Sequence, residues 1–123
     1  MDDLRKAIDC LYRDNASLTA RVTLAEGMSV FEGHFPTQPI LPGVVQLNLV
    51  KMLAEDWAGR RLRLVSVPQM KFTVPVRPGD TVAVTLSPVE TPRGLSVGFS
   101  LELEKGAERL PASRGKVLLT DRR

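Results

Sequence analysis

The amino-acid sequence predicts an α+β domain in which an antiparallel sheet packs around one long helix. Residues 42–58 predict the helix, because this stretch is apolar on most of its circumference and long enough for about four to five helical turns. Other stretches alternate apolar and polar residues with a period of two, as half-buried strands do. Tight turns between these stretches imply antiparallel pairing, and a single apolar helix needs a sheet to cover it.

Length and composition limit the organisation of the chain. With 123 residues, 43% of them hydrophobic, residues 1–123 are expected to form one domain with one core. The only cysteine, Cys10, cannot form an internal disulfide, and the N-terminal residues include acids and no signal-peptide core, so we expect a cytoplasmic protein. No apolar run approaches the ~18 residues of a membrane span, and no membrane role is expected.

The charge of the chain is mildly basic. Its net charge is +3 and its pI is about 9.4, but the Lys and Arg residues are scattered along the sequence. Few aromatic residues are present for base stacking, so nucleic acid is not an expected partner. A basic surface suits an acidic protein or a phosphate-bearing ligand equally well.

The N-terminal third of the chain predicts a helix, a strand and a loop. Residues 2–13 place apolar side chains at helical spacing, which indicates a short amphipathic helix. Residues 17–24 alternate as a half-buried strand does, and residues 25–41 form a loop punctuated by Gly and Pro.

After Gly59 the hydrophobic pattern changes to a period of two. Residues 61–76 predict a long extended stretch, and RPGDT, residues 77–81, supplies a Pro-Gly turn. Further strands are expected over residues 82–90, 95–104 and 115–121.

The stretch FEGHFPTQPILPGVVQLNLV, residues 31–50, contains the residues best suited to take part in catalysis. His34 is the only imidazole in the chain, and therefore the only unperturbed side chain suited to act as a base near neutral pH. Taken by itself, the position favours a loop histidine whose ring bonds to a backbone carbonyl. Pro42 and Gly43 are a helix start signal, but the amides of Gly43 and Val44 would also be free donors at the positive end of that helix.

This stretch resembles the signature of the β-hydroxyacyl-acyl-carrier-protein dehydratases of the FabA and FabZ type. That pattern runs Gly-His-Phe-Pro, Pro three residues on, Pro-Gly-Val, and then a carboxylate five residues after that glycine. The later segments KFTVPVRPGDTV and SRGKV are similar to family segments in the same order, and PILPGVVQL is closest to short dehydratase-like proteins associated with aryl polyene and related acyl pathways. The matching positions of the signature are Gly33, His34, Phe35, Pro36, Pro39, Pro42, Gly43 and Val44.

The resemblance implies a fold, a reaction and a set of partners. The fold would be a hot-dog, a sheet wrapped around one central helix, and the chain would form a homodimer or a higher oligomer in which His34 of one copy meets residue 48 of the other. The substrate would be a thioester of an acyl carrier protein or of CoA, and no cofactor and no metal are expected. By resemblance His34 is the base and the Gly43 amide the oxyanion donor, and the substrate would lie against Phe35, Pro36 and Val44.

Two features depart from the family pattern. The N-terminal Leu-Pro-His-Arg stretch is missing, which argues against the housekeeping fatty-acid enzyme. Asn48 stands where the family has its catalytic Glu or Asp, about 7.5 Å along the helix from Gly43. An amide can hold a hydroxyl or a water but cannot deliver a proton, and loss of a general acid typically costs ~10²- to 10⁴-fold in rate. Glu55 and Glu32 are the nearest carboxylates along the chain.

Three functions therefore remain open. The first is a dehydratase or hydratase in which His34 does most of the chemistry and Asn48 positions the hydroxyl. The second is a non-catalytic acyl-binding or auxiliary hot-dog protein, and the third is a hot-dog thioesterase. Either an acidic carrier docks on the following cations, or they form an ordinary solvated face: Arg60, Arg61, Arg63, Lys71 and Arg77.

Overall fold

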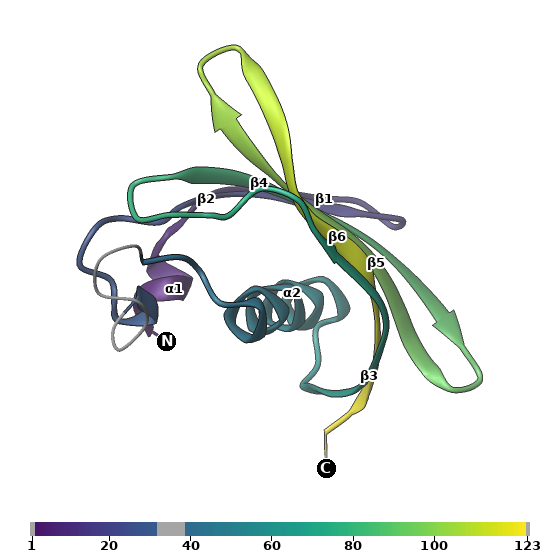
Figure 1. The fold of residues 1–123 in the computed structure, drawn as a ribbon. Coiled ribbons are helices and arrows are strands. Elements are labelled where there is room, and N and C mark those ends of the chain that lie inside the picture. Colours follow the sequence, from purple (N-terminus) through teal and green to yellow (C-terminus); the bar gives the residue numbers. More distant parts are fainter. Residues whose placement is uncertain (1, 32–38, 123) are drawn as a thin grey trace.

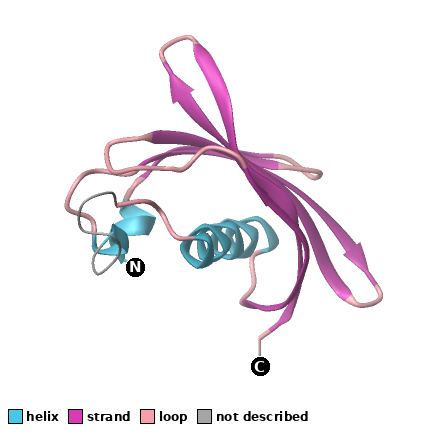
Figure 2. Ribbon diagram, viewed as in Figure 1, coloured by secondary structure: helices cyan, strands magenta, loops and turns pink. Residues whose placement is uncertain are grey.

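The computed structural model describes residues 2–31 and 39–122 and shows a curved antiparallel sheet wrapped around one long helix (Figure 1). The strands lie in the order β1-β2-β4-β5-β6-β3, and α2 lies within the curve of the sheet (Figure 2). The predicted architecture is confirmed. In chain order the elements are α1 (Asp2–Lys6), β1 (Ile8–Arg13), β2 (Leu18–Thr23), the 3₁₀ helix η1 (Ser29–Phe31), α2 (Gly43–Ala58), β3 (Leu62–Phe72), β4 (Thr81–Thr91), β5 (Gly94–Lys105) and β6 (Glu108–Asp121).

The core lies between the sheet and α2. In β5 every second residue from Leu95 to Leu103 is buried, as the period of two in this stretch predicts. Val82, Val84 and Leu86 of β4 pair with β5 and are fully buried on the same face. The predicted strands after Gly59 are therefore confirmed, although β6 begins well before the expected residue 115.

The predicted helix over residues 2–13 is wrong in its second half. The helix α1 ends at Lys6, and Ile8–Arg13 form the edge strand β1, which pairs with β2. Leu11 and Tyr12 follow the helical spacing, yet they are 41% and 63% exposed. Tertiary pairing with β2 therefore overrides a short local pattern.

A side-chain cap turns the chain between β1 and β2. The Asp14 carboxylate accepts hydrogen bonds from the backbone amides of Ala16 and Ser17, each at 2.8 Å. These two bonds lower the pKa of Asp14, because they favour its charged form. The turn brings residues 8–13 back onto β2, which a helix over the same residues would not allow.

Helix α2 is fastened to the sheet near its N-terminal end by a buried glutamine. Gln46 is 4% exposed, and its side-chain amide donates to the Leu41 carbonyl at 3.2 Å. Its side-chain oxygen accepts from the hydroxyl of Ser113 on β6 at 2.7 Å, and Ser113 is 3% exposed. Both ends of the glutamine amide are thus satisfied in a buried position, as burial of a polar group requires.

The other end of α2 is held by a glycine cap and by an indole. Gly59 has a φ of 69°, and its amide donates to the Glu55 carbonyl at 2.8 Å. The Trp57 indole N–H donates to the Asp14 carbonyl in the β1–β2 turn at 2.9 Å.

Among the described residues, no helix is both long and apolar enough to cross a membrane.

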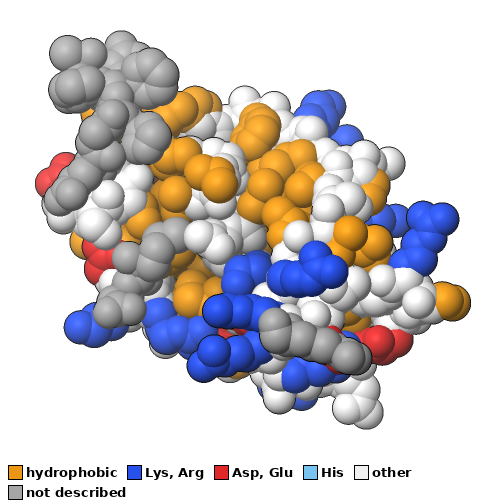
Figure 3. All heavy atoms as spheres, turned by 90° about the horizontal axis from the view of Figure 1, so that it is seen from below, with side chains coloured by type: hydrophobic (Ala, Val, Ile, Leu, Met, Phe, Trp, Pro, Cys, Tyr) orange, Lys and Arg blue, Asp and Glu red, His pale blue; other side chains and the backbone are white. Residues whose placement is uncertain are grey.

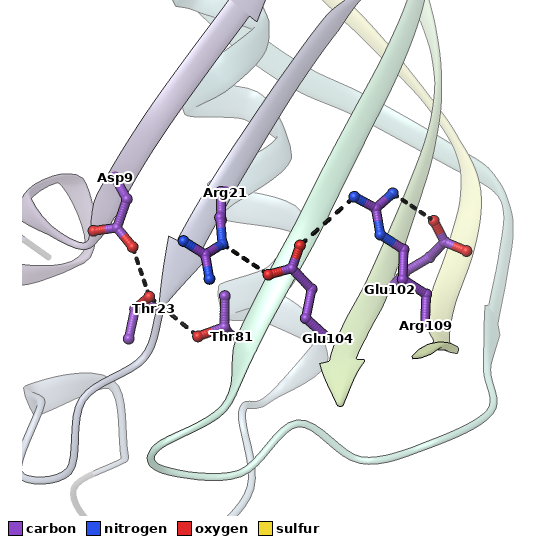
Figure 4. A network of polar contacts seen from close by, with 7 residues as sticks. All are labelled: Asp9, Arg21, Thr23, Thr81, Glu102, Glu104 and Arg109. Atoms are coloured by element: carbon purple, nitrogen blue, oxygen red, sulfur yellow. Dashed lines mark hydrogen bonds and ion pairs between the residues drawn. The ribbon is translucent and has the colours of Figure 1, made fainter. Parts of the chain in front are cut away.

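The face of the sheet away from α2 carries a polar network (Figure 4). Arg21 of β2 contacts Glu104 of β5 at 2.7 Å, and Arg109 of β6 contacts Glu104 and Glu102 at 3.6 and 3.8 Å. The Thr23 hydroxyl donates to Asp9 at 2.7 Å and also contacts Thr81. Exposed ion pairs contribute only about 0–1 kcal/mol each, so this face keeps the strands in register more than it stabilises the fold.

We predict that Gln46→Leu lowers the free energy of unfolding by about 1–3 kcal/mol, because the Ser113 hydroxyl and the Leu41 carbonyl then lose their buried partner. Denaturant unfolding measures the change. Adding Ser113→Ala should recover part of the loss, since it removes one of the two unsatisfied groups. Gln69→Leu, at an exposed position of β3, is the matched control and should stay within about 0.5 kcal/mol. An unchanged stability of Gln46→Leu would contradict the structural role of the glutamine.

Candidate active site

A pocket of about 320 Å³ lies between α2 and the beginning of β3. One helix face, one strand and the C-terminal residues contribute to it. Its walls combine aliphatic side chains with cationic ones. The lining residues are Val44, Leu47, Asn48, Lys51, Leu62, Arg63, Leu64 and Arg122.

Asn48 lies in this pocket on the face of α2 that the sheet does not cover. Leu49, Val50 and Leu53 point into the core and are fully buried, whereas Asn48 is exposed and Val44 is 70% exposed. The prediction that α2 is buried therefore holds for one face only. The other face presents Val44 and Asn48 outward, next to each other, because residues four apart share one side of a helix.

Gly43 is the first residue of α2, where the first backbone amides have no acceptor within the helix. The preceding residue, Pro42, is extended, with a φ of −63° and a ψ of 151°, and provides no side-chain cap. Its carbonyl accepts from the amides of Val45 and Gln46, each at 3.1 Å. No residue in the described part of the chain accepts from the amides of Gly43 or Val44, which therefore point out at the positive end of the helix. Such a position suits an anionic or partly anionic oxygen.

The aromatic ring of Phe72 lies directly against Gly43. A Cβ at position 43 would lie 2.7 Å from the Cζ atom of the ring, closer than a side chain tolerates. Phe72 ends β3 and is 56% exposed, so it covers the start of α2 from the sheet side without being buried itself. A side chain at position 43 would therefore require the exposed ring of Phe72 to move.

Glu55 does not take the place of the missing carboxylate. One of its carboxylate oxygens accepts from the backbone amide of Leu62 at 2.9 Å, and the other lies 3.8 Å from the Lys51 ammonium. Glu55 does not line the Asn48 pocket. It serves to connect the end of α2 with the first residue of β3.

The surroundings of position 48 combine aliphatic and cationic side chains. Lys51, Arg63 and Arg122 all line the same pocket as Asn48, and none of the described lining residues is a carboxylate. A carboxyl group at this position would therefore have nearby positive charges that favour its ionised form, opposite to the effect of the aliphatic walls.

Several predicted site residues lie outside the described part of the chain. His34, Phe35 and Pro36, together with Glu32, belong to residues 32–38, so their roles stay predictions. Among the described residues, no group of three His, Cys, Asp or Glu side chains could hold a metal ion. On the N-terminal side of this segment Phe31 is buried, and on the other side the amide of buried Leu41 donates to the Val76 carbonyl at 2.7 Å.

The predicted docking cations do not form one patch. Arg60 is paired with Glu90 and Asp121 at 2.7 Å each, and this pairing raises its pKa. Lys71 lines a separate groove on the outer face of the sheet with Arg114. Around α2, however, Lys and Arg side chains border an apolar area (Figure 3). Lys51, Arg63 and Arg122 lie on this side of the molecule, because they line the Asn48 pocket beside α2.

The sequence of the chain matches a known family over most of its length. Residues 11–113 match the family described as ApeI-like, ApeI dehydratase. The chain belongs to the ApeI-like dehydratase family. The FabA and FabZ resemblance of the histidine segment is thereby confirmed at the level of the family.

Individual relatives agree with this family. A 3-hydroxyacyl-[acyl-carrier-protein] dehydratase FabZ from Sulfurimonas denitrificans is 31% identical over 91 residues, which are 63% of this chain and 61% of that protein. The ApeI-like chain thus spans less than two thirds of the length of this curated relative. The dehydratase heterocomplex ApeI:P from Xenorhabdus doucetiae has a similar structure, with a TM-score of 0.78 and 27% identity, covering 92% of this chain and 96% of that one.

The hot-dog fold is shared more widely. A hexameric thioesterase from Yersinia pestis has a TM-score of 0.64 and 17% identity, covering 91% of this chain and 92% of that one. At this identity the likeness shows the fold alone. The predicted hot-dog architecture of the ApeI-like chain is therefore confirmed.

Three further residues shape the site, and the sequence signals them unequally. Gln46 interrupts an apolar helix run and was the most visible signal, since a polar residue on a buried face needs a partner. Lys51 follows Asn48 by one helical turn and could have been placed near it from spacing alone. No pattern in the sequence relates Phe72 to Gly43, because only the fold brings β3 to the start of α2.

We predict that Gly43→Ala is less favourable for the free energy of unfolding in the native background than in a Phe72→Leu background, by about 0.5–1.5 kcal/mol, because the exposed Phe72 ring has to turn away from the new methyl group. In a Phe72→Leu background, Gly43→Ala should be neutral or stabilising, since alanine is favoured over glycine in a helix by up to about 1 kcal/mol. A double-mutant cycle of denaturant unfolding measures the difference. Equal effects in both backgrounds would show that Phe72 does not restrict position 43.

Proposed function

We propose that this ApeI-like protein dehydrates a (3R)-hydroxyacyl thioester carried by an acyl carrier protein or CoA, in fatty acid, polyene or polyketide-type acyl metabolism. The observation that carries the proposal is the open face of α2. The free amides of Gly43 and Val44 and the side chain of Asn48 lie on the same helix, at the spacing of the family signature. The membership of the chain in the ApeI-like dehydratase family supports the same reaction.

The reaction divides between three groups. Dehydration removes a proton from the carbon next to the thioester carbonyl and expels the hydroxyl from the following carbon. We assign the base to His34, by its position in the family signature. The amide of Gly43 stabilises the negative charge that develops on the thioester oxygen, and the start of a helix suits this task. Asn48 holds the hydroxyl of the substrate.

We propose that two copies of the chain complete the site. The outer edge of β3 is unpaired within the chain, and Leu64, Val65 and Phe72 of this strand are exposed. The neighbouring face of α2 exposes Val44 as well. A second copy that extends the sheet along β3 would cover these apolar side chains and would bring its own residues to the Asn48 pocket. The similar structure of a heterocomplex supports an oligomer.

A carrier with negative charges fits the rim of the pocket. Arg63 and Arg122 line the pocket that contains Asn48, and its lining within the described ranges contains no carboxylate. Acyl carrier proteins are acidic and hold their acyl chain on a phosphate-bearing arm. Charges at the rim act mainly on the rate of association.

The second candidate function is an auxiliary subunit without its own turnover. Asn48 favours it, because an amide cannot act as the acid of the reaction. The name of the similar Xenorhabdus structure describes a heterocomplex, which supports a chain that pairs with a different relative. Activity of the isolated protein separates the two functions.

We predict that Asn48→Asp raises kcat for dehydration of a β-hydroxyacyl thioester by at least about tenfold at pH 6, part of the usual contribution of a general acid. The cations of the pocket favour the ionised carboxylate, and only the protonated form is an acid. The ratio of the variant rate to the native rate should therefore fall between pH 6 and pH 8. Steady-state kinetics over this range tests both statements.

The controls separate the outcomes of this experiment. His34→Ala should abolish the native and the enhanced rate, because both need the base. A slower Asn48→Asp variant would mean that the amide itself contributes, for example by orienting the hydroxyl. If neither form converts any hydroxyacyl or enoyl thioester, the auxiliary function is correct.

We predict a dimeric mass by sedimentation at micromolar concentration, and a shift towards the monomer for Val44→Asp. Val44 is exposed in the single chain, so the variant should keep its fold and its circular dichroism spectrum. A charge buried between two apolar surfaces weakens their association. A monomeric native protein would contradict the shared site.

A further inference from the structure

Within the described residues, the pocket beside Asn48 contains one side chain that can release a proton. Its polar members in these ranges are Asn48, Lys51, Arg63 and Arg122. A side-chain amide is not an acid in water, and an arginine guanidinium is not deprotonated in proteins. An ammonium group has three N–H donors and gives up a proton more readily. Of the described lining residues, Lys51 is therefore the one able to perform the step that Asn48 cannot perform.

Lys51 is positioned for a group bound at Asn48. It follows Asn48 by three residues on the same helix, and residues at this spacing are neighbours on the helix surface. Its side chain is 25% exposed, and its ammonium lies 3.8 Å from Glu55. At this distance the Lys51 ammonium and the Glu55 carboxylate form an ion pair but no hydrogen bond. No residue in the described ranges accepts a hydrogen bond from Lys51. Its donors are free for a ligand in the pocket.

Glu55 keeps the ammonium in place without competing for the ligand. The carboxylate is anchored on the amide of Leu62, the first residue of β3, at 2.9 Å. Because Glu55 itself lies outside the pocket lining, it can orient Lys51 but not reach the site directly. The arrangement therefore presents one cationic proton donor to a mostly aliphatic cavity, where charge acts more strongly than in water.

We propose that Lys51 is a catalytic residue that protonates the leaving hydroxyl of the substrate. This inference rests on the proposed dehydratase function. In the step, the base takes the proton of C2, and the electrons of that C–H bond form the C2–C3 double bond. The C3–O bond breaks at the same time, and its oxygen takes a proton from the Lys51 ammonium and leaves as water. The amine that remains regains its proton from solvent.

The test compares Lys51 variants in two backgrounds, with a hydroxyacyl thioester as substrate. In the native background Lys51→Met should lower kcat by at least about tenfold, as loss of a general acid does. Lys51→Arg should lower it similarly, because a guanidinium keeps the charge but does not release its proton. In the Asn48→Asp background, where the new carboxyl supplies the proton, each change should cost less than about threefold.

Lys105→Met is the matched control, since it removes a lysine that pairs with Asp80 at 2.9 Å away from the pocket. It should leave kcat within about threefold in both backgrounds. Thermal unfolding of each variant verifies the fold.

Three results would overturn the role of Lys51. Full activity of Lys51→Arg would mean that only the charge matters. An equal loss from Lys51→Met in both backgrounds would mean a structural role. Unchanged activity of Lys51→Met in an active native background would exclude Lys51 as an acid while the proposed function stands. An inactive native protein, with or without an active Asn48→Asp variant, would contradict the proposed function itself.

Discussion

A buried side-chain amide joins the central helix to the sheet, and the geometry of the open helix face depends on it. Gln46 needs a donor and an acceptor at the same time, and Ser113 and the Leu41 carbonyl supply them. Apolar contacts alone do not set the rotation of a helix against a sheet, because they have no direction. A hydrogen-bonded amide does. Once Gln46 faces the sheet, Val44 and Asn48 must face away from it.

The two faces of α2 therefore serve different purposes. The inner face packs into the core and contributes to the apolar burial that stabilises the fold, through residues such as Leu49 and Leu53. The outer face leaves an apolar residue, an amide and a cation next to one another in a pocket. The free amides at the start of the same helix add positive partial charge. One helix thus supplies both the core and the polar groups of the candidate site.

Charge distinguishes this pocket from one built around a carboxylate. Among the residues that the structure describes, three cations and no carboxylate line it, so it favours a group on which negative charge develops. In such a setting a neutral amide at position 48 adds no negative charge near that group. The departure from the family pattern at Asn48 is thus accompanied by a definite electrostatic environment, formed by α2, β3 and the C-terminal residues.

Patterns of sufficient length predicted most of the fold. The helix at residues 42–58 and the strand at residues 95–104 were found within a residue or so, because many residues repeat one period there. Residues 8–13 were misassigned, since six residues fit a helical and an extended period almost equally well. The Asp14 turn and the pairing with β2 decide between them.

The sequence by itself determined the family, the α+β class, and the helix that bears Gly43 and Asn48. Local periodicity and a motif of fixed spacing are enough for this. Only the tertiary structure decided which residues surround that helix. Ser113 lies 67 residues from Gln46, and Phe72 reaches Gly43 from the end of β3. Such contacts depend on strand order and register, which arise when the whole sheet closes around the helix and which no short stretch of sequence encodes.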